Sequence, residues 1–109
     1  MEFAKALDTS ELPEGKMAKV VVGATEVLLA NVAGSYYAIA NKCKHLGGSL
    51  ANGKLEGSIV TCPRHGAQYD AKTGQGVLGA KMAFLRMPAR DEETYTVKVE
   101  GTSIMIGKP

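Results

Sequence analysis

The chain has 109 residues, of which 45% are hydrophobic and 22% charged, and its formal net charge is +2. These values describe one ordinary domain and argue against a disordered or fibrous protein. The small charge gives no reason to expect a nucleic-acid partner, and no apolar run reaches the roughly 18–20 residues that span a bilayer.

Short strand-like runs follow one another along the chain, and long amphipathic helical periodicity is absent. The segment 23–25 suits a tight hairpin turn between the first two runs, and residues 94–99 alternate polar and apolar side chains. This pattern favours an all-β sandwich or small barrel, built as a single domain over residues 1–109. The strand-like runs are residues 17–22, 26–32, 35–40, 54–61, 94–99 and 103–106.

Charge is distributed unevenly along the chain. Residues 1–41 carry three basic and five acidic side chains, and residues 91–109 carry two basic and four acidic ones. Residues 42–90 carry eight basic and two acidic side chains, a net charge of +6. Such a segment is typical of a surface that steers towards an acidic partner, although a merely solvated basic face has the same composition.

The only two cysteines and the only two histidines lie within 23 positions of one another. Cys43 and His45 form a C-x-H pair, and Cys62 and His65 form a C-x-x-H pair sixteen residues later. Each pair is followed by glycine. Two such loops at the tips of adjacent hairpins are able to grip one inorganic centre from opposite sides.

Three interpretations of these four residues remain open. The cysteines can be small hydrophobic core residues and the histidines surface residues, but this leaves their grouping unexplained. A tetrahedral Cys2His2 zinc site is the second interpretation, although zinc motifs usually pair Cys with Cys and His with His. The third is a two-iron, two-sulfide cluster with two cysteines on one iron and two histidines on the other.

The strings CKHLG from Cys43 and CPRHG from Cys62, followed by Tyr69-Asp70 and Thr73-Gly74, resemble the two cluster-binding loops of the Rieske iron–sulfur family. The resemblance covers residues 34–79 well and the rest loosely. It implies an antiparallel β fold with a cluster-binding subdomain, roughly residues 41–79, at one tip.

The resemblance also implies one [2Fe–2S] cluster, with Cys43 and Cys62 on the inner iron and His45 and His65 on the outer, near-surface iron. Two thiolates neutralise the oxidised core, so reduction adds an electron to a neutral site, and this raises the reduction potential above that of an all-cysteine site. The outer histidines offer protein redox partners a short electron path.

Departures from the family pattern indicate which branch the chain resembles. Respiratory Rieske proteins carry two further cysteines that form a loop disulfide, and the matching positions here are Gly48 and Arg64 or near neighbours. Ala67 replaces a serine that donates to a bridging sulfide, whereas Tyr69 stands where a tyrosine donates to a cysteine sulfur. We therefore expect a lower-potential, ferredoxin-like centre with Tyr69 at its edge.

Residues 76–87 extend the segment that precedes the family's proline-containing loop, which here reaches Pro88. The extension contains Met82, Phe84, Leu85 and Met87. These apolar side chains shield the cluster or fill the core, or else they form an exposed apolar and basic lip for partner docking.

The resemblance implies a soluble one-electron carrier between a reductase and a terminal oxygenase or other oxidoreductase, and not an enzyme by itself. The small Rieske-like subunit of an assimilatory nitrite reductase and a zinc-stabilised binding module are the alternatives. Residues 1–10 show no secretory signal and two cysteines make no disulfide scaffold, so the sequence predicts a cytoplasmic protein without membrane contact.

Overall fold

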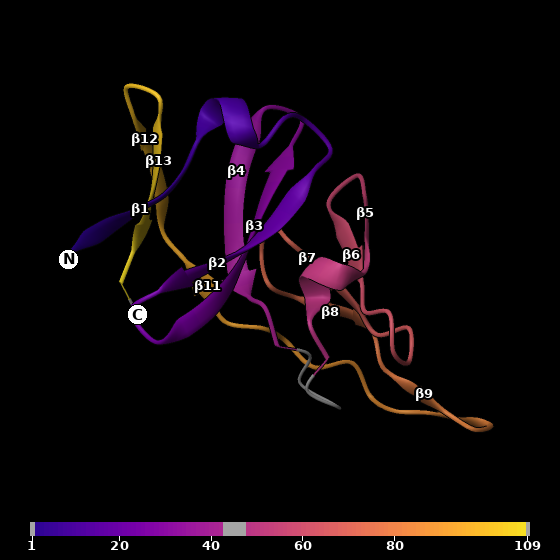
Figure 1. The fold of residues 1–109 in the computed structure, drawn as a ribbon. Helices are drawn as coiled ribbons and strands as arrows, with labels where there is room; N and C mark the ends of the chain where they lie inside the picture. Colours follow the sequence, from indigo (N-terminus) through magenta and orange to yellow (C-terminus); the bar gives the residue numbers. More distant parts are fainter. Residues whose placement is uncertain (1, 43–47, 109) are drawn as a thin grey trace.

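A computed structural model of the chain describes residues 2–42 and 48–108 (Figure 1). Over these residues the chain folds into β-strands and two short 3-10 helices, without an α-helix. The molecule is elongated, with extents of 48 × 26 × 19 Å. In the same two ranges, no helix has the length and hydrophobicity needed to cross a membrane.

The elements alternate between strands and tight turns, which confirms the all-β fold expected from the sequence. In chain order they are β1 (Phe3–Asp8), η1 (Thr9–Glu11), β2 (Met17–Val22), β3 (Thr25–Val32), β4 (Ser35–Ala40), η2 (Leu50–Asn52), β5 (Lys54–Glu56), β6 (Ile59–Thr61), β7 (Gln68–Asp70), β8 (Gly76–Leu78), β9 (Lys81–Met82), β10 (Leu85–Arg86), β11 (Thr94–Tyr95), β12 (Val97–Glu100) and β13 (Ser103–Gly107).

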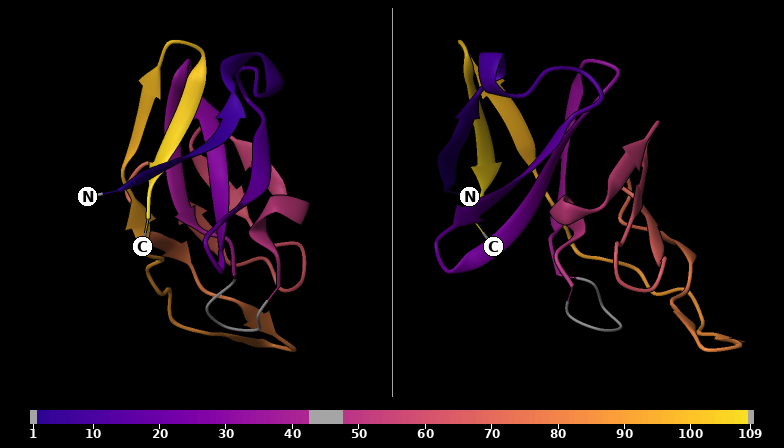
Figure 2. Two further views of the ribbon diagram at one scale, coloured as in Figure 1. Left: turned by 60° about the vertical axis from the view of Figure 1, so that its left-hand side comes forward. Right: turned by 45° about the vertical axis from the view of Figure 1, so that its right-hand side comes forward.

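The strands form antiparallel sheets that lie in layers along the long axis (Figure 2). The central sheet has the order β11-β4-β3-β2, and the sheet β1-β13-β12 packs on one of its faces. The sheet β5-β6-β7-β8 packs on the other face, and the separate hairpin β9-β10 extends beyond it at one end of the molecule.

Strand β3 joins the two halves of the core because both of its faces are covered. Residues 27–32 are all buried, and successive side chains of a strand point to opposite faces. Leu29 therefore packs in one cluster with Ile104 of β13, while Leu28 packs in the other with Val60 of β6. A strand buried on both faces tends to a continuous apolar run, and residues 27–32 are apolar except for Asn31, whose side chain is hydrogen-bonded.

Two predicted runs are each divided in the structure. Residues 54–61 form the β5–β6 hairpin because Gly57, with φ of 61°, turns the chain. Residues 94–99 split at Thr96, where the chain leaves the central sheet for the β12–β13 pair. Strand β1 is not among the predicted runs, and its partner β13 lies at the other end of the chain.

Candidate metal centre

Cys62 and His65 lie in the loop at the tip of the β6–β7 hairpin. The last strand pair joins Thr61 to Gln68. The Cys62 N–H then donates to the Ala67 carbonyl at 2.7 Å, and the Gly66 N–H donates to the Cys62 carbonyl at 3.2 Å. These bonds close a short loop on a rigid strand pair, so the two side chains that the sequence analysis predicts as ligands are presented from one tip.

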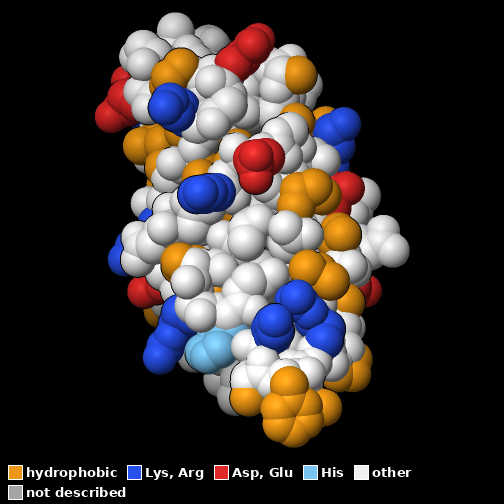
Figure 3. Space-filling view, turned by 90° about the vertical axis from the view of Figure 1, so that its right-hand side faces the viewer, with side chains coloured by type: hydrophobic (Ala, Val, Ile, Leu, Met, Phe, Trp, Pro, Cys, Tyr) orange, Lys and Arg blue, Asp and Glu red, His pale blue; other side chains and the backbone are white. Residues whose placement is uncertain are grey.

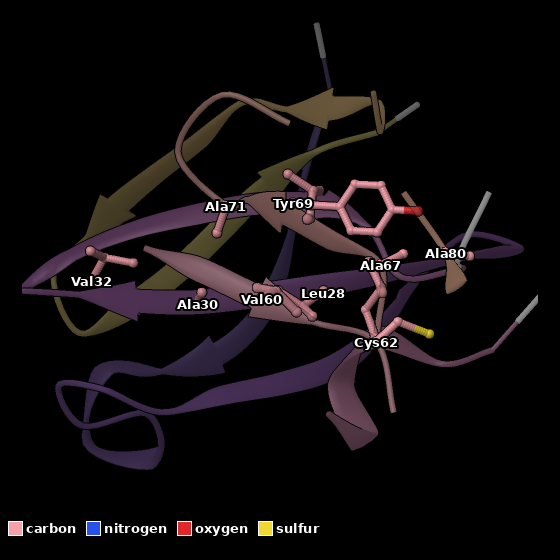
Figure 4. Close-up of a cluster of buried hydrophobic side chains, with 11 residues drawn as sticks. Leu28, Ala30, Val32, Val60, Cys62, Ala67, Tyr69, Ala71 and Ala80 are labelled. Carbon is pink, nitrogen blue, oxygen red and sulfur yellow. The ribbon is translucent and has the colours of Figure 1, made fainter. Parts of the chain in front are cut away.

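The two side chains differ in burial. Cys62 is 2% exposed and belongs to the cluster of buried side chains between the sheets, and its sulfur points out of the end of that cluster (Figure 4). His65 is half-buried, but its Nδ1 atom is buried and has no hydrogen-bond partner among the residues that the structure describes. An imidazole nitrogen in this state is available to a metal.

Cys43 and His45, the other two predicted ligands, lie outside the described residues. The ends of their segment are described, however, and Asn41 holds them together. Its side chain donates to Ser49 Oγ at 2.8 Å and accepts the Ala51 N–H at 2.9 Å. Its carbonyl accepts the Leu50 N–H at 2.8 Å. The start and the end of residues 42–48 are therefore fixed next to each other.

Gly48 connects this segment to the second loop. A Cβ atom at Gly48 would lie 2.8 Å from Cδ of Arg64 and 3.3 Å from Sγ of Cys62. Glycine permits this close approach because it has no side chain. Gly48, which follows the undescribed residues, thus packs against the loop that carries Cys62 and His65.

Tyr69 lies behind the second loop. It is fully buried on β7, opposite Val60 of β6, and its hydroxyl points towards the end of the cluster where the Cys62 sulfur lies (Figure 4). Ala67, also fully buried, provides no hydroxyl. The predicted donation from Tyr69 to a cysteine sulfur stays a prediction.

These residues fit an iron–sulfur cluster bound by cysteine and histidine. A buried thiol, a buried imidazole nitrogen without a hydrogen-bond partner, and a glycine that opens the space beside the sulfur lie together at one tip. A polar atom buried without a partner costs free energy, and coordination to a metal would offset that cost. The ligand roles of the four residues remain predictions.

Sequence reasoning missed two groups that position this tip. Asn41 directly follows the strand-like run 35–40 and shortly precedes the first ligand pair, and an asparagine at such a place was the available signal. The Lys81 backbone N–H donates to the His65 carbonyl at 2.8 Å. No sequence signal marks that contact, because it joins backbone atoms from segments that are distant in the chain.

Comparison with known proteins identifies the family. The family model that describes the Rieske [2Fe–2S] domain matches residues 2–89 of the chain. The chain is 35% identical to the ferredoxin component of the naphthalene 1,2-dioxygenase system of Pseudomonas aeruginosa, over 96% of this chain and 94% of that protein. It is 30% identical to the biphenyl 2,3-dioxygenase ferredoxin component of Rhodococcus jostii, over 97% of this chain and 92% of that protein.

Solved structures agree with the sequence matches. The ferredoxin of carbazole 1,9a-dioxygenase from Nocardioides aromaticivorans superposes with a TM-score of 0.85 at 26% identity, covering 100% of both chains. A structure of oxidised ferredoxin in complex with reduced oxygenase, also of carbazole 1,9a-dioxygenase, matches with a TM-score of 0.77 at 25% identity, over 95% of this chain and 91% of that one. The chain belongs to the Rieske [2Fe–2S] family, whose members carry one [2Fe–2S] cluster.

Proposed function

We propose that this chain is a one-electron carrier in which Cys43 and Cys62 bind one iron of the cluster and His45 and His65 bind the other. One observation carries the proposal: His65 Nδ1 is buried without a hydrogen-bond partner among the described residues, three positions from the buried Cys62 on the same hairpin tip. When bound, the cluster accepts and releases one electron.

The chain's own residues hold that centre at the surface. The β6–β7 hairpin fixes the second loop, and the Asn41 contacts fix the ends of the first. His65 is half-buried, so part of its ring lies at the molecular surface. An electron leaving through this edge has a short path to a docked protein.

The relatives support a role between two proteins. They are named as ferredoxin components of dioxygenase systems, and a similar ferredoxin is seen in complex with its oxygenase. We infer that this chain takes electrons from a reductase and passes them to a terminal oxygenase or another oxidoreductase, docking near His45 and His65. The chain itself is then not an enzyme.

We further propose that the carrier is a single domain that works in the cytoplasm. Residues 1–109 act as one domain, with the cluster-binding subdomain at roughly 41–79. Thiols stay reduced in the cytoplasm and are available there as metal ligands, which favours a cytoplasmic location.

The test is the metal content and redox behaviour of the purified protein. We expect about two iron and two sulfide ions per chain, and a one-electron reduction that yields a paramagnetic state in electron paramagnetic resonance. His65→Ala should lose the cluster, whereas Lys72→Ala, at an exposed site, should retain it. A colourless protein that holds zinc and no iron would contradict the proposal.

A further inference from the structure

The β9–β10 hairpin is the most exposed apolar part of the described chain. Lys81 pairs with Arg86 and Met82 with Leu85, so Ala83 and Phe84 form the two-residue turn. Phe84 is 89% exposed and Leu85 60% exposed. Of the six large hydrophobic residues that are exposed in the described ranges, four belong to or flank this hairpin: Val77, Phe84, Leu85 and Met87.

This exposure argues against a core-filling role for the apolar residues of segment 76–87. The base of the hairpin is built into the fold, because Ala80 is fully buried and its carbonyl accepts the Met87 N–H at 2.7 Å. Arg86 Nη1 also donates to the Gly79 carbonyl at 2.9 Å. The apolar side chains of Phe84 and Leu85 nevertheless face solvent, so they form a lip and do not fill the core.

The lip is connected directly to the candidate metal centre. The Lys81 N–H donates to the His65 carbonyl at 2.8 Å, so the first residue of β9 is bonded to the loop of the predicted ligands. Figure 3 shows the histidine side chain on the same face as the hydrophobic tip, with lysine and arginine side chains near both. A protein bound to the lip therefore lies beside the edge through which we propose that the electron leaves.

The positive charge around the lip indicates which kind of partner surface the lip fits. From residue 71 to residue 90 the chain carries Lys72, Lys81, Arg86 and Arg90 and no acidic residue. Opposite charges across an interface accelerate and orient association. Aromatic and arginine side chains are also enriched among residues that dominate protein–protein binding energy. The complementary surface is an apolar cavity rimmed by carboxylates.

We propose that the β9–β10 hairpin docks in such a cavity on the terminal oxygenase, with Phe84 as its anchor, and so sets the position of His65 against the acceptor. This inference rests on the proposed function and names the surface that the electron carrier uses. The oxygenase is chosen as occupant because the lip is continuous with the His65 edge, and because a similar ferredoxin binds an oxygenase in a solved complex.

The test compares exposed apolar-to-serine variants of the cluster-loaded protein. Phe84→Ser changes the lip, and Val21→Ser is the matched control because Val21 is 62% exposed on β2, in a different sheet. Each protein is reduced chemically and mixed with purified oxygenase components of the naphthalene and biphenyl dioxygenase systems. The oxygenase that the unmodified protein reduces fastest is used for the comparison.

For Phe84→Ser we expect the protein concentration that gives half-maximal electron-transfer rate to rise about tenfold, with an unchanged midpoint potential and an unchanged rate at saturation. Val21→Ser should match the unmodified protein. Equal behaviour of the two variants would overturn the docking proposal and leave the electron-carrier function standing. If the unmodified protein reduces neither oxygenase, the proposed acceptor class and the docking proposal fail together.

Two further measurements test whether a second copy of the chain or a membrane surface binds the lip instead. Sedimentation of the cluster-loaded protein should give a monomer, and vesicles with anionic lipids should not bind it. A dimer that Phe84→Ser dissociates would assign the lip to a second copy of the chain. Vesicle binding that the same variant abolishes would assign it to a membrane surface. Either result would overturn the docking proposal.

Discussion

Tyr69 shows what one side chain contributes at the candidate metal centre. Its ring is fully buried between the sheets, and its hydroxyl is directed to the end of the cluster that holds the Cys62 sulfur (Figure 4). A hydrogen bond to a thiolate ligand stabilises the reduced, more negative state more than the oxidised state, and hydrogen bonds to cluster sulfurs are among the determinants of potential.

Tyr69→Phe should therefore lower the midpoint potential. A hydrogen bond is worth about 0.5–1.5 kcal/mol, which for one electron corresponds to a shift on the order of 20–65 mV. The measurement is a redox titration of the cluster-loaded protein, with the visible spectrum as control for an intact site. An unchanged potential with an intact spectrum would remove this role from Tyr69.

Tyr95, on β11, determines part of the alkaline stability. Burial raises the pKa of Tyr95 above 10.0, the ordinary value for tyrosine, and the carboxylates of Glu93 and Glu92 raise it further. Below pH 10 the phenol is protonated in both the folded and the unfolded chain. Above pH 10 the unfolded chain releases this proton more easily, so the free energy of unfolding falls as the pH rises through the pKa of the folded state.

Tyr95→Phe should make that loss of stability between about pH 9 and pH 11 shallower, because phenylalanine has no proton to release. Urea unfolding at a series of pH values measures the free energy of unfolding of the unmodified protein and of the variant. Every other ionisable group is the same in both proteins, so the difference between the two curves isolates Tyr95. If the two curves of unfolding free energy against pH were parallel, the environment of Tyr95 would not contribute to the loss of stability at alkaline pH.

At the scale of elements, the contact between the end of β4 and the η2 turn fixes the first ligand segment. Asn41 follows β4 directly and is fully buried, and its side chain bonds both Ser49 and the Ala51 backbone. The hydrogen bonds of one side chain thus add to the backbone bonds at the point where the chain leaves the central sheet. A buried, fully bonded amide of this kind is costly to remove.

Asn41→Ala should lower the free energy of unfolding by about 1–3 kcal/mol, since the Ala51 N–H and the Ser49 hydroxyl lose their partner. The variant should also release iron faster when a chelator is added, because the side-chain bonds that help to hold the ends of residues 42–48 together are lost. Asn52→Ala is the control at an exposed asparagine in the same turn. Equal iron loss from the two variants would show that the clamp does not support the metal centre.

At the scale of the whole molecule, charge is arranged for association. The segment 42–90, with a net charge of +6, includes the candidate metal centre and the β9–β10 hairpin, and the two flanking segments are acidic. Figure 3 shows lysine and arginine side chains beside the histidine, and acidic side chains mainly towards the opposite end. This asymmetry orients the tip towards an acidic protein surface before contact.

The rate of electron transfer to the partner at low protein concentration should accordingly fall on the order of tenfold between low and high ionic strength. Lys81→Gln should make this dependence weaker, whereas Lys19→Gln, an exposed change on β2, should leave it unchanged. Stopped-flow mixing at several salt concentrations measures how steeply the electron-transfer rate depends on ionic strength. A rate that does not fall with salt would exclude electrostatic steering.

The sequence by itself determined the features that depend on short spacings. β2 and β4 begin and end at the predicted residues, because tight turns interrupt apolar runs there. The two Cys/His pairs and their glycines were also readable, since ligand chemistry depends on residue type and local spacing. The family and its cofactor followed from these motifs and agree with the comparisons.

Only the tertiary structure decided which distant segments meet. β1 is a strand because β13 pairs with it, and residues 94–99 divide because their two halves belong to different sheets. Gly48 lies against Cys62, and Lys81 is bonded to His65, through contacts between different segments of the chain. Such contacts depend on how the sheets pack, and a local pattern of residues does not contain that information.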